Sequence, residues 1–353
     1  MTPSSQTMEP PSNPGQFNVV IATRVGLGKI CLVNQDTAIN QDLRGIVPLS
    51  TDVLNVRYLF WWLKSIAHLI EKEGTGATVK GVKLPFVKSL RIPLPPLPKQ
   101  KRIVAILDEA FVGITQTIAN AEKNLANARE LFESYLNNVF AQKGEGWVDA
   151  PIEDHIKFID YRGRTPKKID AGMRLITAKN VKMGFLQLEP QEFVEPNIYE
   201  EWMTRGIPKK GDVLFTTEAP LGNVAQLDTD EKVLFAQRVI IMQPNRDVLK
   251  PTFLKYMLMS RTLQSRLHEK ATGATAKGIK ASLLKKVSIL FPQDTAIQKA
   301  IVSQLETLGI ETQNLETIYQ KKLTALVELK QSILQKTFKG ELTADVVSRQ
   351  VVN

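Results

Sequence analysis

The stretch that decides the fold reads ITQTIANAEKNLANARELFESYLNNV, from Ile114 to Val139. Its apolar side chains recur at alternating steps of four and three residues, and no proline interrupts it. This heptad spacing places an apolar seam along one side of a helix, and a partner helix must cover that seam. We predict a helix over residues 99–143, about 60 Å long. The seam consists of Ile114, Ile118, Ala121, Leu125, Ala128, Phe132, Tyr135 and Val139.

A second stretch repeats this spacing and predicts another long helix, over residues 293–340. Its apolar positions are Ile301, Leu305, Leu308, Leu315, Tyr319, Leu326, Leu329 and Ile333, with Thr312 and Lys322 as polar interruptions. Two long seams in one chain can cover each other, so we predict an antiparallel coiled coil. The side chains expected to pair the helices are Ile114, Ile118, Leu125 and Phe132 in the first and Leu308, Leu315, Leu326 and Leu329 in the second.

The duplication extends beyond the helices. The segment TGATVKGVK, from Thr75 to Lys83, returns as TGATAKGIK, from Thr272 to Lys280. Gln41 matches Gln237 in the same way, and the offset stays at about 194 to 198 residues throughout. A period of this length exceeds that of a solenoid repeat. It indicates the duplication of a whole domain together with its helix.

Composition limits the possible functions. The chain has 353 residues, of which 43% are hydrophobic, and a net charge of +10, which suggests a polyanionic partner such as nucleic acid. A solvated basic surface without a partner is the plainer alternative, but the positive charge is clustered. Cys31 is the single cysteine, which excludes an intrachain disulfide and fits the reducing cytoplasm. No apolar run reaches the roughly eighteen residues of a membrane span, so we expect no membrane partner.

These observations predict an α+β protein with two domains that contain mixed or antiparallel sheets and flanking helices, each followed by a long helix. The first long helix should begin after Pro98, because prolines interrupt helices. Single shorter helices are expected over Val56–Glu71 and Thr252–His268. The expected divisions are a disordered leader at 1–16, a first domain at 17–98, the first helix at 99–143, a second domain at 144–292, the second helix at 293–340 and a tail at 341–353.

Catalytic motifs are missing. The segment Gly76–Gly81 has the glycine spacing of a phosphate-binding loop, but Val82 and Lys83 follow where that motif needs lysine and then serine or threonine. The three histidines His68, His155 and His268 are too scattered for a metal site. We therefore expect neither an enzyme nor a bound cofactor or metal.

The remaining candidates are basic segments suited to DNA. Small residues let main-chain N–H groups approach phosphates, and lysines neutralise phosphate charge. Each segment alone is more simply an ordinary polar turn, but its presence in both domains favours function. Arginine and amide side chains can read bases, although nothing in the sequence separates base from phosphate contacts. The candidates are Gln41, Thr75, Thr78, Lys80, Lys83, Arg162, Arg164, Thr165, Lys167, Lys168, Lys179, Asn180, Gln237, Arg238, Thr272, Thr275, Lys277 and Lys280.

The chain also resembles a known family, the DNA-specificity (S) subunits of type I restriction-modification systems. The resemblance is carried by Trp147-Val148 with Arg164–Pro166, by Leu175–Val181, Gly211–Thr217, Gly273–Thr275 and Ile92–Gln100, and by Leu329–Ser332 with Phe338–Leu342. It implies two target-recognition domains that each read half of a split double-stranded DNA sequence, and helices that set the gap between the halves. It also implies docking of methyltransferase (M) and restriction (R) subunits, to which S-adenosylmethionine, ATP and magnesium belong.

The repeat offset also predicts that the first domain lacks about sixty residues equivalent to Trp147–Lys210. We therefore expect a truncated or silent specificity subunit that reads one half-site, or one that pairs with a second copy through the intact halves. Two other classes stay open. A coiled-coil scaffold without DNA binding leaves the duplicated basic loops unexplained, and an enzyme in its own right lacks its motifs.

Overall fold

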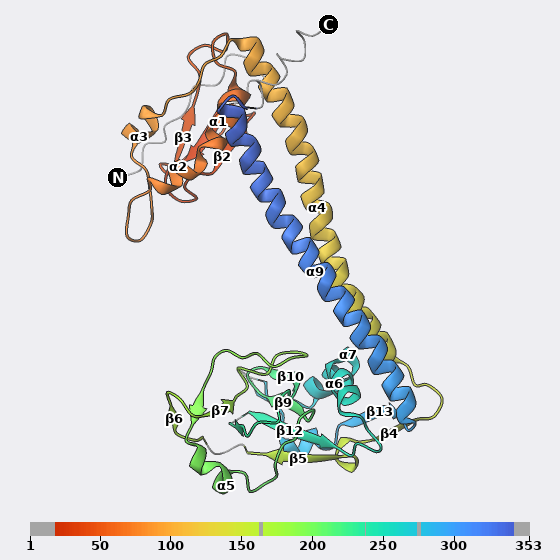
Figure 1. The fold of residues 1–353 in the computed structure, drawn as a ribbon. Helices are drawn as coiled ribbons and strands as arrows, with labels where there is room; N and C mark the ends of the chain where they lie inside the picture. Colours follow the sequence, from red (N-terminus) through yellow and green to blue (C-terminus); the bar gives the residue numbers. More distant parts are fainter. Residues whose placement is uncertain (1–17, 162–164, 237, 274–276, 342–353) are drawn as a thin grey trace. The chain divides into compact units, whose positions relative to one another are not determined.

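The computed structural model describes residues 18–161, 165–236, 238–273 and 277–341. The chain divides into two compact units, which are described one at a time (Figure 1). Unit 1 comprises Met1–Leu125 and Ile318–Asn353, and unit 2 comprises Ala126–Thr317. Each unit therefore combines one globular domain with a segment of both long helices, α4 (Leu97–Ala141) and α9 (Thr295–Phe338).

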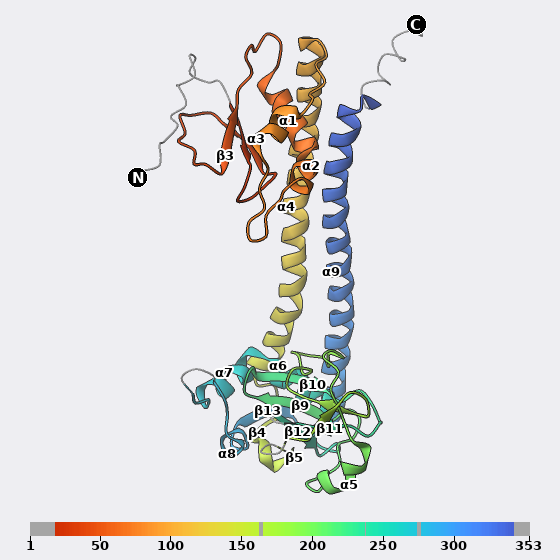
Figure 2. The same cartoon turned by 90° about the vertical axis from the view of Figure 1, so that its left-hand side faces the viewer.

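The globular part of unit 1 is a three-stranded antiparallel sheet covered by helices. The strand order is β2-β1-β3, so β1 is central. The helix α1 lies next to this sheet (Figure 2). Val19 and Ile21 of β1 are fully buried in the core that the sheet forms with α1, and Trp61 of α1 donates a hydrogen bond of 2.9 Å to Asp108 of α4. The elements are β1 (Asn18–Ala22), β2 (Ile30–Val33), β3 (Leu43–Ile46), α1 (Val56–Ser65), α2 (Ala67–Lys72) and α3 (Leu84–Ser89).

Unit 2 contains two four-stranded sheets and a two-stranded pair. The central sheet has the antiparallel order β10-β9-β12-β5, the second sheet has the order β11-β7-β8-β6, and β13 pairs with β4. The strands are β4 (Trp147–Pro151), β5 (Ile156–Asp160), β6 (Lys168–Ile169), β7 (Met173–Ile176), β8 (Phe193–Val194), β9 (Val213–Thr217), β10 (Leu221–Gln226), β11 (Leu234–Phe235), β12 (Val239–Pro244) and β13 (Ser288–Pro292). The helices are η1 (Ile152–Asp154), η2 (Pro196–Ile198), α5 (Tyr199–Trp202), α6 (Pro251–Met259), α7 (Arg261–Glu269) and α8 (Ala281–Leu284).

Alternation along β9 separates two cores in unit 2. Val213 and Phe215 face the core that contains α6 and α7, whereas Leu214 faces the core formed with the second sheet. All three side chains are fully buried. Successive side chains of a strand point to opposite faces, so this apolar run marks a strand that is covered on both sides.

The duplication is visible strand by strand. The order β2-β1-β3 of unit 1 repeats β10-β9-β12 of unit 2, and the described residues of unit 1 contain no counterpart of β5. In unit 1, β1 is central and β2 and β3 are the edge strands. A strand equivalent to β5 would pair with β3, because β5 pairs with β12.

A buried glutamine repeats in both units and ties each long helix to its globular domain. Gln100 accepts a hydrogen bond from the Asn55 N–H and donates to the carbonyls of Val53 and Pro95. Gln298 makes the same three bonds with Lys250, Val248 and Pro292, at 2.8 Å each. Both glutamines have no exposed surface, so their polar atoms depend on these partners.

Replacing Gln298 with alanine should destabilise unit 2 by several kcal/mol, because each buried polar group left unpaired costs about 1–3 kcal/mol. Urea unfolding followed by circular dichroism measures this loss. The control is Gln116→Ala, since Gln116 is exposed on α4 and donates its side-chain hydrogen bond to the neighbouring Asn120 side chain. A loss for Gln298→Ala no larger than for the control contradicts the expectation.

The prediction of two shorter helices, each continuous, is wrong. The helix expected over Val56–Glu71 is divided into α1 and α2, and the one expected over Thr252–His268 is divided into α6 and α7. Ser65 and Ser260 lie at the corresponding breaks, where their hydroxyls donate to the carbonyls of Trp62 (2.6 Å) and Met257 (2.7 Å). A serine hydroxyl that bonds a carbonyl of the preceding turn offers the backbone an alternative to continuing the helix.

The first long helix begins earlier than predicted. It starts at Leu97 and includes Pro98, which we placed before the helix. Proline is tolerated in the first turn because the N–H it lacks has no partner there. One 18-residue window of this helix has a mean hydropathy of 1.3, which meets the length and composition of a membrane span. One such helix in the described part of the chain is weak evidence for a membrane, because long helices of other proteins meet the same criteria.

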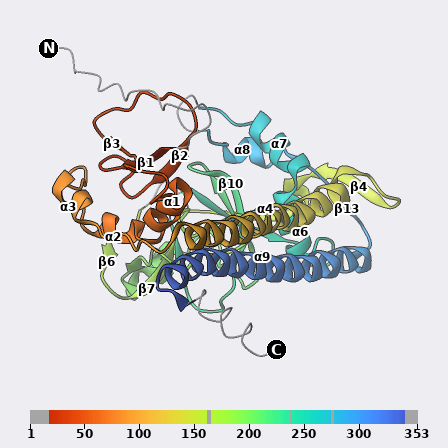
Figure 3. The same ribbon diagram turned by 90° about the horizontal axis from the view of Figure 1, so that it is seen from above.

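The long helices pack antiparallel within each unit (Figures 1 and 3). In unit 2, Arg129 pairs with Glu316 at 2.9 Å, and Tyr135, further along α4, donates to Gln304, earlier in α9. In unit 1, Leu107 of α4 and Leu334 of α9 belong to one core. The predicted antiparallel pairing is therefore present in both units.

The predicted seam holds for α4 but only partly for α9. Ile114 is 8% exposed, and Ile118, Leu125 and Phe132 are partly buried. In α9, Leu308 and Leu326 are partly buried, but Leu315 and Leu329 are 38% and 46% exposed, so their assignment to the seam is wrong. Thr312, which we treated as an interruption, is buried. The inner side of α9 keeps the heptad spacing, but every second position lies one residue later than predicted. It runs through Leu305, Gly309, Thr312, Glu316, Tyr319, Leu323 and Leu326.

Candidate DNA interface

The duplicated basic loops have the same backbone anchoring in both domains. Thr75 and Gly81 exchange two hydrogen bonds of 3.0 and 2.9 Å, and Thr272 and Gly278 exchange two of 2.9 Å. The following residue then bonds the end of a central strand, Val82 to Thr23 and Ile279 to Thr217, at 2.9 Å in each case. The exposed candidates of these loops are Thr75, Thr78, Lys80, Lys83, Thr272, Lys277 and Lys280, and Thr275 lies outside the described residues.

Three segments distant in sequence meet at one end of the central sheet of unit 2. Thr217, the last residue of β9, donates to the Arg238 carbonyl just before β12. Asp160, the last residue of β5, pairs with Ile240, and the DNA-binding candidates between 162 and 168 follow it in the sequence. The loop that begins at Thr272 joins the same end through its bond to Thr217. The sheet thus gathers at one end basic segments that the sequence keeps apart.

Two of the predicted lysines are paired with a carboxylate. Lys168 and Lys179 lie 2.8 and 3.5 Å from the Glu192 carboxylate, and the hydrogen bond from Lys168 is the main reason why the pKa of Glu192 is lowered. Both lysine side chains remain about half exposed or more. Thr165 and Lys167 are exposed, whereas Arg162 and Arg164 lie outside the described residues.

Asn180 is a correction to the predicted interface. Its side-chain oxygen accepts hydrogen bonds from the backbone and hydroxyl of Thr177. Its side-chain nitrogen donates to the carbonyls of Gln187, Leu188 and Pro190, and the residue is only 1% exposed. A fully engaged buried amide holds the turn together and offers no atom to DNA.

The remaining predicted readers lie at the surface as far as they are described. Gln41 and Arg238 are exposed, and Gln237 lies outside the described residues. The sequence analysis missed two residues at this end of the sheet. Glu218 forms an ion pair with Arg238 at 2.9 Å, and Arg205 donates a hydrogen bond of 2.5 Å to the Asp160 carbonyl. No local motif marks either residue, since only the sheet brings them to this end.

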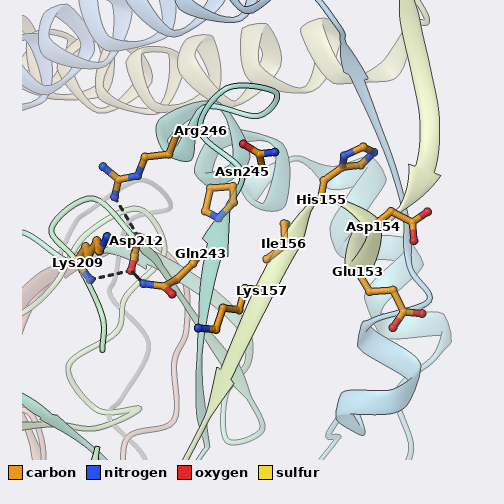
Figure 4. A pocket seen from close by; sticks show the side chains of 11 residues that line it. Glu153, Asp154, His155, Ile156, Lys157, Lys209, Asp212, Gln243, Asn245 and Arg246 are labelled. Carbon is orange, nitrogen blue, oxygen red and sulfur yellow. Dashed lines mark hydrogen bonds and ion pairs between the residues drawn. The ribbon is translucent and has the colours of Figure 1, made fainter. Parts of the chain in front are cut away.

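A separate pocket lies at the other end of the central sheet, where β5 begins and β12 ends (Figure 4). Its polar side chains hold the local structure together. Its buried carboxylate, Asp212, accepts hydrogen bonds from the Lys209 N–H, Gln243 and Arg246 at 2.5–3.1 Å. The His155 ring packs edge-on against Phe291 at 5.0 Å. Nowhere in the described part of the chain do three or more histidine, cysteine or acidic side chains gather in a way that could hold a metal.

Comparison with known proteins decides the family. Residues 12–126 and 197–325 match the family described as "Type I restriction modification DNA specificity domain". The chain belongs to this family. Among curated proteins, it is 23% identical to the EcoBI specificity subunit of Escherichia coli, over 84% of this chain and 68% of that one. It is also 23% identical to the MjaVIII specificity subunit of Methanocaldococcus jannaschii, over 82% of this chain and 71% of that one.

Solved structures agree on the fold. The crystal structure of the HsdS subunit from Thermoanaerobacter tengcongensis aligns with a TM-score of 0.60 and 22% identity, over 92% of this chain and 81% of that one. A structure from a study of type I R-M complex assembly and conformational transition aligns with a TM-score of 0.75 and 20% identity, over 96% of this chain and 85% of that one. The α+β fold with two recognition domains and long helices is thus confirmed. The specificity family also confirms the predicted non-catalytic role.

Proposed function

We propose that this chain recognises a split double-stranded DNA sequence, with each globular domain reading one half and the α4–α9 pair setting the gap. The observation that carries the proposal is the duplicated loop. In both domains a threonine and a glycine close the loop, exposed lysines accompany it, and the residue after the glycine is bonded to the end of the central strand. Equivalent anchoring presents the same phosphate-binding chemistry twice, as a bipartite target requires.

Two equivalent grooves support docking of methyltransferase subunits. The groove of unit 1 has a volume of about 810 Å³ and that of unit 2 about 840 Å³. In the sequence repeat, Trp61 and Asp108 of the unit 1 groove are equivalent to Tyr256 and Glu306 of the unit 2 groove. Exposed apolar residues, Val112 at 71% and Ile310 at 62%, line them. Exposed apolar surface of this kind marks protein contacts. We assign the grooves to methyltransferase subunits, with the restriction subunit joining that complex.

The cofactor chemistry belongs to the partners under this proposal, and the chain itself supplies recognition in the cytoplasm. The uncovered β3 edge and the absence of a β5 counterpart among the described residues of unit 1 favour weak reading of the first half-site. Pairing of two chains through their second domains is the alternative, and it yields a palindromic split site. Sequencing the methylated bases of cells that carry only this specificity gene distinguishes the two.

Replacing Lys277 and Lys280 with alanine should weaken binding to all DNA sequences and reduce the slope of log affinity against log salt by about 1.8, since each phosphate contact contributes about 0.9. Filter binding over a salt series measures the slope. Lys123→Ala, an exposed lysine on α4, is the control and should leave it unchanged. Absence of any salt-dependent DNA binding by the unmodified chain would favour the coiled-coil scaffold instead.

A further inference from the structure

An ion pair stands beside the basic loop of unit 2. The Arg238 guanidinium lies 2.9 Å from the Glu218 carboxylate, and both side chains are about half exposed. Arg238 has a φ of 74°, which is unusual for a residue with a side chain. Its carbonyl is fixed by the N–H and hydroxyl of Thr217, at 2.8 and 3.3 Å. The protein thus holds this arginine in an unfavourable backbone conformation, which is commonest at functional positions.

The pair is in direct contact with the loop proposed to bind phosphates. Glu218 forms an antiparallel bridge with Gly278. The two residues are so close that a Cβ atom at Gly278 would lie 3.2 Å from the Cβ atom of Glu218. The Glu218–Arg238 pair therefore lies next to Lys277 and Lys280. A side chain here is well placed to reach a base edge when the loop binds the DNA backbone.

Unit 1 has the same backbone arrangement with the charges exchanged. Thr23 donates its N–H and hydroxyl to the Asp42 carbonyl at 2.8 and 3.1 Å, just as Thr217 does to Arg238. Arg24 follows Thr23 and lies against Gly81, as Glu218 follows Thr217 and lies against Gly278. The arginine of unit 1 therefore lies just after β1, the strand equivalent to β9, and the arginine of unit 2 lies just before β12.

The exchanged residues of unit 1 do not form an ion pair. Within the described part of the chain, the exposed Arg24 side chain has no hydrogen-bond or ion-pair partner, and one carboxylate oxygen of Asp42 is buried without one. A pair required for stability would be kept in both copies of a duplicated domain. Identical backbone bonds with exchanged side chains are instead expected where two domains select different half-site sequences.

We propose that Arg238 and Arg24 are specificity-determining residues that each read a guanine, one in each half-site, with Glu218 positioning Arg238. Arginine binds the O6 and N7 atoms of guanine through two parallel hydrogen bonds in the major groove. Because Arg24 follows β1 and Arg238 precedes β12, the two arginines lie at non-equivalent positions, and the guanine occupies a different place in each half-site. The inference rests on the proposed function, since it requires these sheet ends to meet DNA.

Selection of bound sequences from a random double-stranded library by the full chain tests the proposal. Arg238→Ala should reduce discrimination at one guanine of the second half-site by about 5- to 150-fold and leave the first half-site unchanged. Arg24→Ala should do the converse. Arg238→Lys, which keeps the charge but loses the two-pronged geometry, should relax the same guanine as Arg238→Ala, and this shared effect excludes misfolding as the cause.

Lys277→Ala is the matched control and should lower affinity uniformly across sequences. Uniform weakening by Arg238→Ala, or no effect of either arginine substitution, would overturn the reader assignment while leaving the proposed function intact. Enrichment of no motif by the unmodified chain would instead overturn the proposed function. The two failures are therefore distinguishable.

Discussion

Leu305→Lys is expected to disrupt unit 2. Leu305 of α9 has no exposed surface and belongs to the same core as Leu136 and Phe140 of α4. A lysine there either buries an unpaired charge or leaves the core, and an unpaired buried charge costs about 3–5 kcal/mol. Domains are stable by only about 5–15 kcal/mol in total, so the loss is a large fraction. Chemical denaturation, with circular dichroism as the readout, measures it.

The control tests whether a position that only the sequence assigns to the seam of α9 matters for stability. Leu329→Lys lies at a position that the heptad pattern assigns to the seam, whereas the side chain is 46% exposed. We expect a change within about 0.5 kcal/mol, as is usual for surface substitutions. Equal destabilisation by Leu305→Lys and Leu329→Lys would show that the seam predicted from the sequence describes α9 better than the structure does.

Insertion of one heptad into each long helix should abolish recognition of the original site and create a new one. Seven residues lengthen a helix by about 10 Å, which corresponds to about three base pairs of DNA. Matched insertions after Leu125 and Tyr319 should therefore widen the gap by about three base pairs and leave both half-sites unchanged. Affinity for the original site should fall by a factor of about 10³ or more, toward non-specific binding.

Sequencing the methylated sites of cells that carry the doubly inserted gene measures the new gap. An insertion into α4 alone is the control, because it leaves a seam without its partner and should impair folding rather than shift the gap. If the doubly inserted chain methylates sites with the original gap, or with altered half-sites, the helices do not act as a ruler.

The sequence by itself determined the two long helices, the duplication and the family. Heptad periodicity is a local property, and the seam from Ile114 to Phe132 could be read without knowing its partner. A repeat such as TGATVKGVK and TGATAKGIK needs no structure to be recognised. Both signals depend on spacing along the chain. For the same reason they could not locate the inner side of α9, where every second seam position lies one residue later than predicted and Leu315 and Leu329 are exposed.

The tertiary structure alone decided which candidate side chains are available to DNA. Asn180 has an amide side chain of the kind that contacts DNA, but it is buried, and its polar atoms are hydrogen-bonded to Thr177, Gln187 and Pro190. Glu218 carries no sequence signal, and it meets Arg238 only because β9 and β12 pair in one register. Hydrogen bonds between strands join residues about twenty positions apart, and no local pattern encodes which side chains then share an end of the sheet.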